Sequence, residues 1–288
     1  MSYLSQIQGI SKAKHNSTTI ILGKPGSGKT TLAGTFPKPM LLITVGKDGG
    51  AEVLKSYSDA DVQTINIDND AVNAMSSISV YNKLMAIFDE LLKDDKFKTI
   101  VVDPYTSIQE GLINYMSSQK GKQLSQQEYG MVGQLMLAMR DKIDVIADGS
   151  REVVLICHIK ENEQTDSITG EKTKELVPKM TLNNGKILLE HASAVLYTCN
   201  KTVQDENGNG VVKFLTYVGA HPNIDTKFRT AKGKALTVGK YYENFNYDTM
   251  RKLYNGDVLI EEQKEIRVIE PTDNPFEEKT DNKTEGDW

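Results

Sequence analysis

One stretch near the start of the 288-residue chain constrains the fold more than any other. It runs from Thr18 to Thr31 and reads TTIILGKPGSGKTT, an apolar run followed by a glycine-rich loop. Four residues fill the fixed places of the pattern G-x-x-x-x-G-K-[ST]: Gly23, Gly28, Lys29 and Thr30. A chance glycine turn beside a lysine is disfavoured, because the strand pattern before the loop and the helix pattern after it are the context that the motif requires. The stretch therefore predicts a loop that holds phosphate.

The residue types in this loop fit the groups of a nucleoside triphosphate. Glycine at 23, 26 and 28 lets the backbone approach a phosphate closely, and the following helix points its positive end at the phosphate. Lys29 would supply a positive charge to the β- and γ-phosphates, and the Thr30 hydroxyl is of the type that ligates Mg²⁺. We therefore predict an ATP and Mg²⁺ site. Its nucleotide-binding residues are Gly23, Lys24, Pro25, Gly26, Ser27, Gly28, Lys29, Thr30 and Thr31.

A second acidic position completes the predicted metal site. The segment Phe97 to Asp103 is an apolar strand that ends in a carboxylate. In a nucleotide-binding fold such an acid holds Mg²⁺ opposite the hydroxyl of the glycine loop. A strand-ending aspartate is weak evidence by itself, but it gains weight after a convincing phosphate loop. Thr30 and Asp103 are thus the predicted metal-binding pair.

The hydrophobic pattern predicts an α/β fold with a mostly parallel central sheet flanked by helices and a C-terminal β-hairpin. A helix should follow the loop to about Phe36, and a long helix should begin near Asp70. Further helices should open at two capping boxes, Ser107-x-x-Glu110 and Ser125-x-x-Glu128. A last helix should cover Tyr247 to Tyr254. The predicted strands are Thr18 to Leu22, Met40 to Val45, Val62 to Ile67, Phe97 to Asp103 and Glu152 to Cys157, with the hairpin at Leu196 to Val203 and Val211 to Val218.

Charge divides the chain into two predicted parts. Residues 261–288 carry ten acidic and four basic side chains, whereas the whole chain has a net charge of −5, so residues 1–260 are close to neutral. We predict an ATPase domain over 1–260 and a disordered acidic tail over 261–288. The two cysteines, Cys157 and Cys199, lie in apolar runs and are expected to be buried thiols. We see no export signal or membrane span, and expect a cytoplasmic protein, in a host cell if phage-encoded.

In the order of its motifs the chain resembles the core of the RecA-type ATPases. It is most similar to the small phage and prophage ATPases of that AAA-type group, which are taken to act in ATP-dependent single-strand annealing or recombination. The resemblance covers roughly residues 17–235. Besides the phosphate loop, Asp103 and His158, it is carried by the blocks EYGMVGQLMLAMRDKI and NNGKILLEHASAVLYT.

The resemblance implies roles for further residues. His158 would occupy the place of a γ-phosphate sensor, although a histidine can also simply end a strand. The segments Asn114 to Gln127 and Lys160 to Glu175 match two DNA-binding loops in position, and both are expected to be flexible; solvated loops without a ligand are the alternative. Lys227 and Arg229 would enter a neighbouring subunit's ATP site, unless they form a solvated basic stretch or contact a nucleic-acid backbone.

The catalytic base departs from the RecA pattern. Gly46 stands where RecA-type enzymes keep a glutamate, so Asp48 is our candidate for the residue that orients water, with Glu52 as the next choice. The implied function is DNA-stimulated ATP hydrolysis on single-stranded DNA, in a ring or short filament of identical subunits, in recombination, annealing or replication. The acidic tail would bind a single-strand-binding or other replication or recombination protein.

Two other functions stay open. One is an ATP-dependent loader or adaptor in DNA replication or packaging. The other is a small-molecule kinase, which is disfavoured because the five arginines of the chain are not clustered as a phosphate lid requires.

Overall fold

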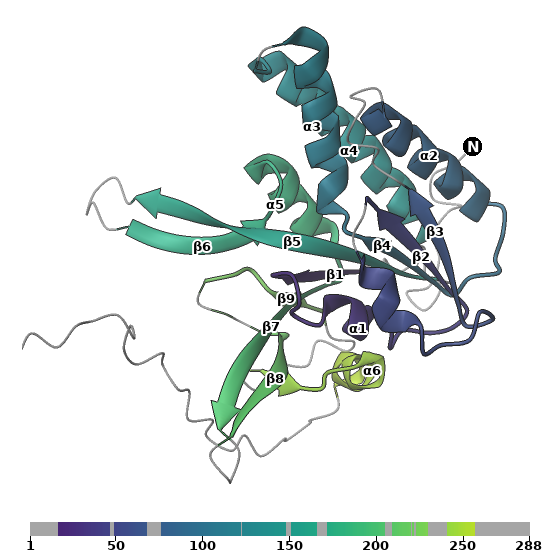
Figure 1. Cartoon of the computed structure of the whole chain (residues 1–288), viewed down its shortest axis with the longest axis vertical. Helices are drawn as coiled ribbons and strands as arrows, with labels where there is room; N and C mark the ends of the chain where they lie inside the picture. Colours follow the sequence, from purple (N-terminus) through teal and green to yellow (C-terminus); the bar gives the residue numbers. More distant parts are fainter. Residues whose placement is uncertain are drawn as a thin grey trace, which may run out of the picture.

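A single large sheet organises the fold (Figure 1). The computed structural model describes residues 17–46, 49–67, 76–121, 123–147, 151–165, 172–204, 209–219, 221, 223–229 and 241–256. The strand order is β10-β8-β7-β1-β5-β4-β2-β3, while β6 pairs with β5 and β9 pairs with β7. The strands are β1 (Thr18–Gly23), β2 (Met40–Val45), β3 (Val62–Ile67), β4 (Thr99–Asp103), β5 (Glu152–Thr165), β6 (Lys172–Pro178), β7 (Ala194–Gln204), β8 (Gly210–Tyr217), β9 (Lys227–Phe228) and β10 (Tyr242–Glu243).

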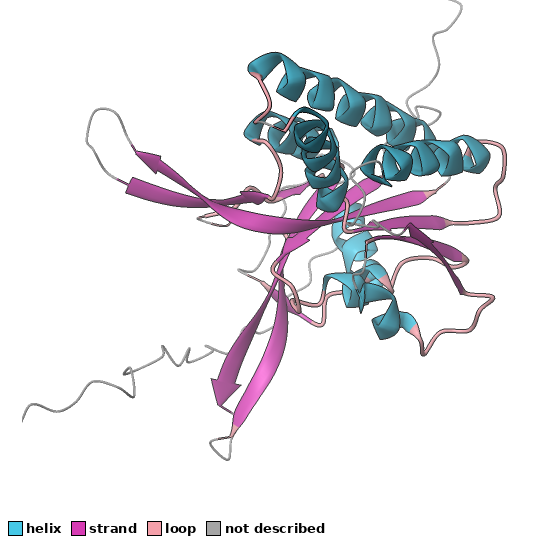
Figure 2. Ribbon diagram, turned by 45° about the horizontal axis from the view of Figure 1, so that its top comes forward, coloured by secondary structure: helices cyan, strands magenta, loops and turns pink. Residues whose placement is uncertain are grey.

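Helices cover both faces of the sheet (Figure 2). Strands β1, β2 and β4 are buried at every position, as apolar parallel strands covered on two sides must be. One face packs against α2 (Ser76–Leu91), α3 (Thr106–Lys120), α4 (Gln126–Ile146) and α5 (Leu182–His191). The other packs against α1 (Lys29–Ala33), the 3₁₀ helix η3 (Gly49–Leu54) and α6 (Tyr247–Asn255). The predicted α/β class and mostly parallel sheet flanked by helices are thereby confirmed.

The parallel strands bring the sequence motifs to one edge of the sheet. β1 lies between β5 and β7, and Gly23 at its end is the register partner of His158. β4 pairs with β5 in parallel and ends at Asp103. Since carboxyl ends of parallel strands share an edge, the phosphate loop, Asp103 and His158 meet there, which is where open α/β sheets bind ligands.

Two sequence predictions about the helices had different outcomes. The box at Ser125 is present, because the Glu128 carboxylate accepts the Ser125 backbone N–H at 2.7 Å and opens α4. The Lys120 ammonium and the Ser125 donors lower the pKa of Glu128 to about 2. The prediction that a capping box at Ser107 opens a helix was wrong, because α3 already begins at Thr106 and Ser107 lies within it.

The first expected flexible segment, Asn114 to Gln127, is largely helical. α3 continues to Lys120, and the segment after it soon enters α4 at Gln126. Met116 packs against the same core as Ile108 and Leu112, so the apolar face of α3 extends into the polar stretch. Tertiary packing therefore overrides the polar local composition.

The second expected flexible segment, Lys160 to Glu175, is a β-hairpin wherever the structure describes it. β5 continues beyond His158 to Thr165 and pairs antiparallel with β6, from Ile159↔Pro178 to Thr165↔Lys172. The two strands project from the core as an arm, which we call the β5–β6 arm (Figures 1 and 2). Its described side chains are mostly exposed or half-exposed on both faces, so no apolar alternation marked it as strand.

The C-terminal elements agree with their predictions. β7 and β8 form the expected antiparallel hairpin, and α6 covers Tyr247–Asn255. Cys157 is buried and Cys199 half-buried, and neither forms a disulfide. The predicted tail over 261–288 and the expected helix start at Asp70 lie outside the described residues. Among the helices that the structure describes, none has the length and apolar character needed to cross a lipid bilayer.

A hydrogen bond between side chains joins α6 to the start of β5. The Tyr247 hydroxyl donates to the Glu152 carboxylate at 2.8 Å, and the Tyr247 backbone N–H donates to the Thr35 hydroxyl at 2.9 Å. Burial raises the pKa of Glu152, an effect only partly offset by Tyr247 and by the charge of Arg251.

This raised pKa predicts the pH dependence of stability. The folded chain binds the Glu152 proton more tightly than the unfolded chain, so the free energy of unfolding falls as the pH rises from the ordinary glutamate pKa through the raised one. In Glu152→Gln the contact with Tyr247 can persist without the charge. We expect its melting temperature, relative to wild type, to be higher near neutral pH than near the ordinary glutamate pKa. The exposed Glu163→Gln is the control, and a difference that does not vary with pH would contradict the assignment.

Candidate functional site

The loop between β1 and α1 has the backbone shape that its glycines permit. Gly26 and Gly28 have φ of 74° and 86°, a region that favours glycine, and Gly28 caps the N-terminus of α1. Gly23 is required for another reason: a Cβ there would lie 2.3 Å from the Ser27 Oγ and 2.6 Å from the Thr198 carbonyl oxygen. The loop thus packs directly on β7.

Side chains of β7 hold the loop in place. The Thr198 hydroxyl lies 2.9 Å from the Ser27 hydroxyl and donates to the Leu22 carbonyl at 3.3 Å. The Asn200 side-chain amide donates to the Gly26 carbonyl at 3.4 Å. α1 begins directly after this loop, beyond the carboxyl end of β1. The backbone N–H groups and the dipole at the start of a helix attract anions.

Lys29 lies across this loop. Its ammonium group donates to the Lys24 carbonyl at 2.8 Å, and only 6% of the residue is exposed. A phosphate oxygen would make a charge-assisted and therefore stronger bond to this ammonium than a neutral carbonyl does. The position is suited to binding the outer phosphates of a nucleotide.

Thr30 and Asp103 meet as the sequence predicted. The Thr30 hydroxyl donates to Asp103 Oδ2 at 2.7 Å, and Asp103 is 3% exposed. A hydroxyl and a carboxylate oxygen side by side are hard donors of the kind that Mg²⁺ takes together with substrate phosphates. The donor set therefore fits a magnesium ion.

Gly50 is a part of this site that sequence reasoning missed. It lies in η3, and a Cβ there would come 2.7 Å from Asp103 Oδ2 and 3.2 Å from Thr30 Oγ1. The only signal in the sequence was the glycine pair that follows β2 in GKDGG. The residue brings the backbone of η3 against the predicted metal-binding pair.

We expect Gly50→Ala to lower Mg²⁺-dependent ATP hydrolysis by roughly tenfold or more, because the added methyl group must displace the Asp103 carboxylate and a small misplacement of reacting groups is costly. Steady-state hydrolysis measured over a Mg²⁺ series would show the loss as a higher Mg²⁺ requirement. Gly130→Ala in α4, where a Cβ meets nothing within 4 Å, is the matched control. Unchanged Mg²⁺ dependence in Gly50→Ala would contradict the assigned role.

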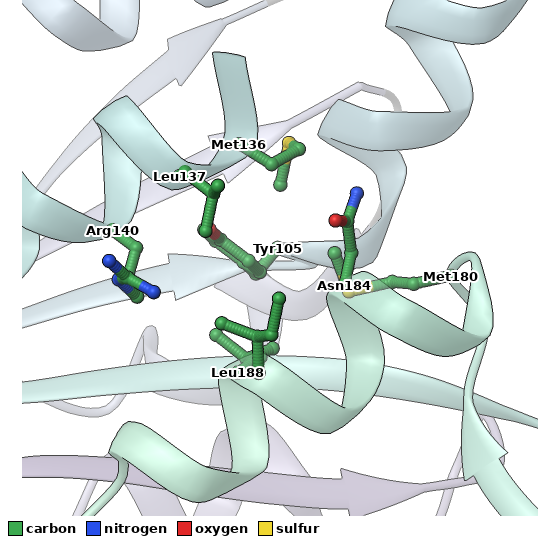
Figure 3. A pocket seen from close by; sticks show the side chains of 8 residues that line it. Tyr105, Met136, Leu137, Arg140, Met180, Asn184 and Leu188 are labelled. Carbon is green, nitrogen blue, oxygen red and sulfur yellow. The ribbon is translucent and has the colours of Figure 1, made fainter. Parts of the chain in front are cut away.

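The loop opens into a pocket of about 350 Å³, within the usual range for small-molecule sites of roughly 300–1,000 Å³. His158, Val53 and Phe214 line it together with the loop, Gly50 and Asp103. A second hollow, between α4 and α5, is of only about 10 Å³ and is lined mainly by apolar side chains around the buried Tyr105 (Figure 3). It can hold no more than about one water molecule. The pocket at the phosphate loop is the candidate site, because the loop, Asp103 and His158 line it together.

Comparison with known protein families agrees with this geometry. Residues 15–230 match the family model AAA_24, described as an AAA domain. The chain belongs to this AAA-domain family. It is therefore a P-loop ATPase domain, and nucleotide binding follows from family membership. No curated protein matches the sequence.

Three solved structures are similar in part to this AAA domain. A prototypical ATPase from the type III secretion system of pathogenic bacteria is 11% identical, with a TM-score of 0.38, over 63% of this chain and 51% of its own. The assembled type III secretion ATPase EscN from enteropathogenic E. coli is 12% identical, with a TM-score of 0.42, over 64% and 43%. The flagellar accessory protein FlaH from Methanocaldococcus jannaschii is 12% identical, with a TM-score of 0.39, over 81% and 91%. The matched part spans about half the length of the two secretion ATPases.

Of the other residues predicted for the site, one lines the pocket and the others do not or are not described. His158 lines the pocket, and its backbone N–H donates to the Thr106 hydroxyl at 3.3 Å. Asp48 lies outside the described residues. Glu52 is paired with Lys55 at 3.1 Å on the surface and does not line the pocket.

Lys227 and Arg229 lie far from the loop of their own AAA domain. β9 pairs with Ala194 and Val195 of β7. Ala194 in turn is the register partner of Thr19, near the start of β1, whereas the phosphate loop follows the end of β1. The Lys227 ammonium donates to the Glu190 carbonyl at 2.6 Å, at the end of α5. The two cations are thus positioned away from the pocket that contains Lys29.

Proposed function

We propose that the chain binds Mg-ATP at the phosphate loop and hydrolyses it while acting on single-stranded DNA. The observation that carries the nucleotide part is the contact between Thr30 and Asp103 at 2.7 Å, beside Lys29 and the loop. The roles proposed from the resemblance are γ-phosphate sensing by His158 and orientation of the attacking water by Asp48. Lys24, Pro25, Ser27 and Thr31 complete the proposed nucleotide-binding set.

The protein groups would act mainly by positioning and by electrostatic stabilisation. Bound Mg²⁺ would neutralise charge on the β- and γ-phosphates. The loop N–H groups and the Lys29 ammonium would hold the phosphates in a fixed orientation, and Thr30 and Asp103 would hold the metal. The His158 side chain, on the strand next to β1 and at the level of Gly23, could hydrogen-bond the terminal phosphate and respond to its loss.

The connection between His158 and the β5–β6 arm supports an ATP-controlled binding surface. β5 runs without interruption from the core through His158 into the arm. The carbonyl of His158 also accepts the Lys179 backbone N–H at 2.8 Å, directly after the returning strand β6. A shift at His158 would therefore act on both strands of the arm. The resemblance to the RecA-type ATPases matches this segment with their second DNA-binding loop.

The position of Lys227 and Arg229 supports a homo-oligomer. In their own chain these cations lie at the opposite end of β1 from the phosphate loop. A ring or short filament would place them beside the ATP of a neighbouring subunit, where a guanidinium stabilises charge on the γ-phosphate.

The test of DNA action is ATP hydrolysis with and without a single-stranded oligonucleotide across a salt series. We expect stimulation that falls as salt rises, because backbone contacts release counterions. A variant with Lys160, Lys172 and Lys174 changed to alanine should lose the stimulation and keep basal hydrolysis. Equal turnover with and without oligonucleotide at every salt concentration would contradict the proposal.

One observation favours a second candidate, an ATP-dependent loader or adaptor. The β5–β6 arm carries as many described acids as bases, and Lys174 lies 3.5 Å from Glu161 and 3.8 Å from Glu163. An arm neutralised in this way suits a protein partner better than a polyanion. Binding to a replication or recombination protein that requires the tail, with no effect of DNA on turnover, would support this candidate.

A small-molecule kinase is disfavoured by the pocket. Among the described residues that line it there is no arginine, although a lid over a transferred phosphate uses such groups. Phosphorylation of a nucleoside would be the result that favours it.

A further inference from the structure

One face of the β7–β8 hairpin lies against the phosphate loop. Thr198 is paired with Thr216 and Asn200 with Phe214 across the two strands, and cross-strand partners point to the same side of a sheet. Thr198 and Asn200 bond to the loop at Ser27 and Gly26. Phe214 must therefore face the same way as these two loop contacts.

The Phe214 ring lies at the edge of the loop and is open to the pocket. A Cβ built on Gly28 would be 3.1 Å from Phe214 Cδ1, so the ring lies against the residue that caps the N-terminus of α1. Phe214 also lines the pocket and is 48% exposed. The ring is therefore an aromatic surface that a ligand in the pocket can contact.

The direction of a bound nucleotide follows from the sheet order. Asp103 and His158, which would face the metal and the terminal phosphate, belong to β4 and β5 on one side of β1. β7 and β8 lie on the other side of β1. With its phosphates held by the loop and its outer phosphate toward β4 and β5, a nucleotide would extend its ribose and base toward β8.

We propose that Phe214 is the platform on which the base of the bound nucleotide stacks. The inference rests on the proposed nucleotide site and adds the part of the ligand that the phosphate loop does not contact. A phenyl ring offers a π-face and no hydrogen-bonding group, so it stacks on any base. The AAA domain should consequently gain affinity from the base through Phe214 without distinguishing adenine from guanine there.

The test compares a whole nucleotide with its phosphate part. Calorimetric titrations of the full chain would use Mg-ATP, Mg-GTP and magnesium tripolyphosphate, which lacks ribose and base. Phe214→Ala should weaken Mg-ATP and Mg-GTP binding by a similar factor, roughly tenfold, since this is what loss of base stacking on an aromatic ring typically costs. Tripolyphosphate affinity should stay within about twofold of wild type, because phosphate contacts are unchanged.

Two further variants complete the experiment. Phe214→Tyr keeps the aromatic face and should bind Mg-ATP as wild type does. Val211→Ala is the matched control, since Val211 is 41% exposed on the same strand but pairs with Val203 on the opposite face. It should leave all three affinities unchanged.

Several results would overturn the platform. An equal loss for Mg-ATP and tripolyphosphate in Phe214→Ala would mean that the ring only supports the loop, and a gain for both would mean that it obstructs the site. Unchanged Mg-ATP binding would remove the inference altogether. If the wild-type chain binds neither Mg-ATP nor tripolyphosphate, the nucleotide site itself fails, and that result differs from failure of the platform.

Discussion

Lys29→Ala is expected to lower nucleotide binding and hydrolysis by roughly a hundredfold or more, the scale of loss when a preorganised charge-stabilising donor is removed. The Lys29 ammonium lies over the loop, 2.8 Å from the Lys24 carbonyl, and the alanine variant leaves the loop with no charge at this point. Calorimetry with Mg-ATP would report the binding loss, and steady-state phosphate release would report the loss in turnover.

The fold should survive this change. Lys29 belongs to neither apolar core of the sheet, so its removal takes charge and not core volume. The melting temperature of Lys29→Ala should therefore stay close to that of wild type. Lys55→Ala, with a side chain 73% exposed, is the control that should keep full activity. Hydrolysis that persists in Lys29→Ala would show that the site lies elsewhere.

The sequence predicted the centre of the fold well because its signals there are local. The strands β1, β2 and β4 are continuous apolar runs, as buried parallel strands require, and the fixed residues of the loop lie within one short segment. Parallel pairing then places Asp103 and His158 near the loop without any further information. The predicted contact of Asp103 with Thr30 depends only on these rules.

The features that were missed depend on contacts between distant segments. Thr198 and Phe214 reach the loop from β7 and β8, and no local pattern marks them as neighbours of Ser27 and Gly28. Gly50 lies at the candidate site only because η3 folds onto Asp103. The residues that shape the pocket wall are therefore decided by tertiary packing, which single-sequence patterns do not record.

The loop predicted over Lys160 to Glu175, which is the β5–β6 arm, was wrong for a different reason. Strand prediction relies on alternation between a buried and an exposed face, and this arm extends away from the core so that neither face is consistently buried. Its stability comes from the ladder with β6 over seven register pairs, Ile159↔Pro178 to Thr165↔Lys172. A polar sequence can therefore be a strand here, and composition alone suggested a loop.

Asp103→Asn is expected to reduce Mg²⁺-dependent hydrolysis by roughly a hundredfold or more, a loss of the size seen when charge stabilisation at a reacting phosphate is removed. The substitution keeps the volume of the side chain, and the Thr30 hydroxyl can still donate to the amide oxygen that replaces Asp103 Oδ2. The change therefore removes one negative charge from a residue that is 3% exposed and leaves the packing intact. Nucleotide binding should lose its dependence on Mg²⁺ at the same time.

The design separates a metal role from a structural one. ATP affinity measured with Mg²⁺ and with a chelator should differ in wild type and converge in Asp103→Asn, whereas a purely structural aspartate would change both affinities together. The melting temperature should stay close to that of wild type, because the substitution keeps the side-chain volume and the hydrogen bond from the Thr30 hydroxyl can persist. Asp89→Asn, 54% exposed beside Lys142, is the matched control. If Asp103→Asn keeps the Mg²⁺ dependence of wild type, the ion is held by other groups, and Thr30 and Asp103 form only a structural hydrogen bond between α1 and β4.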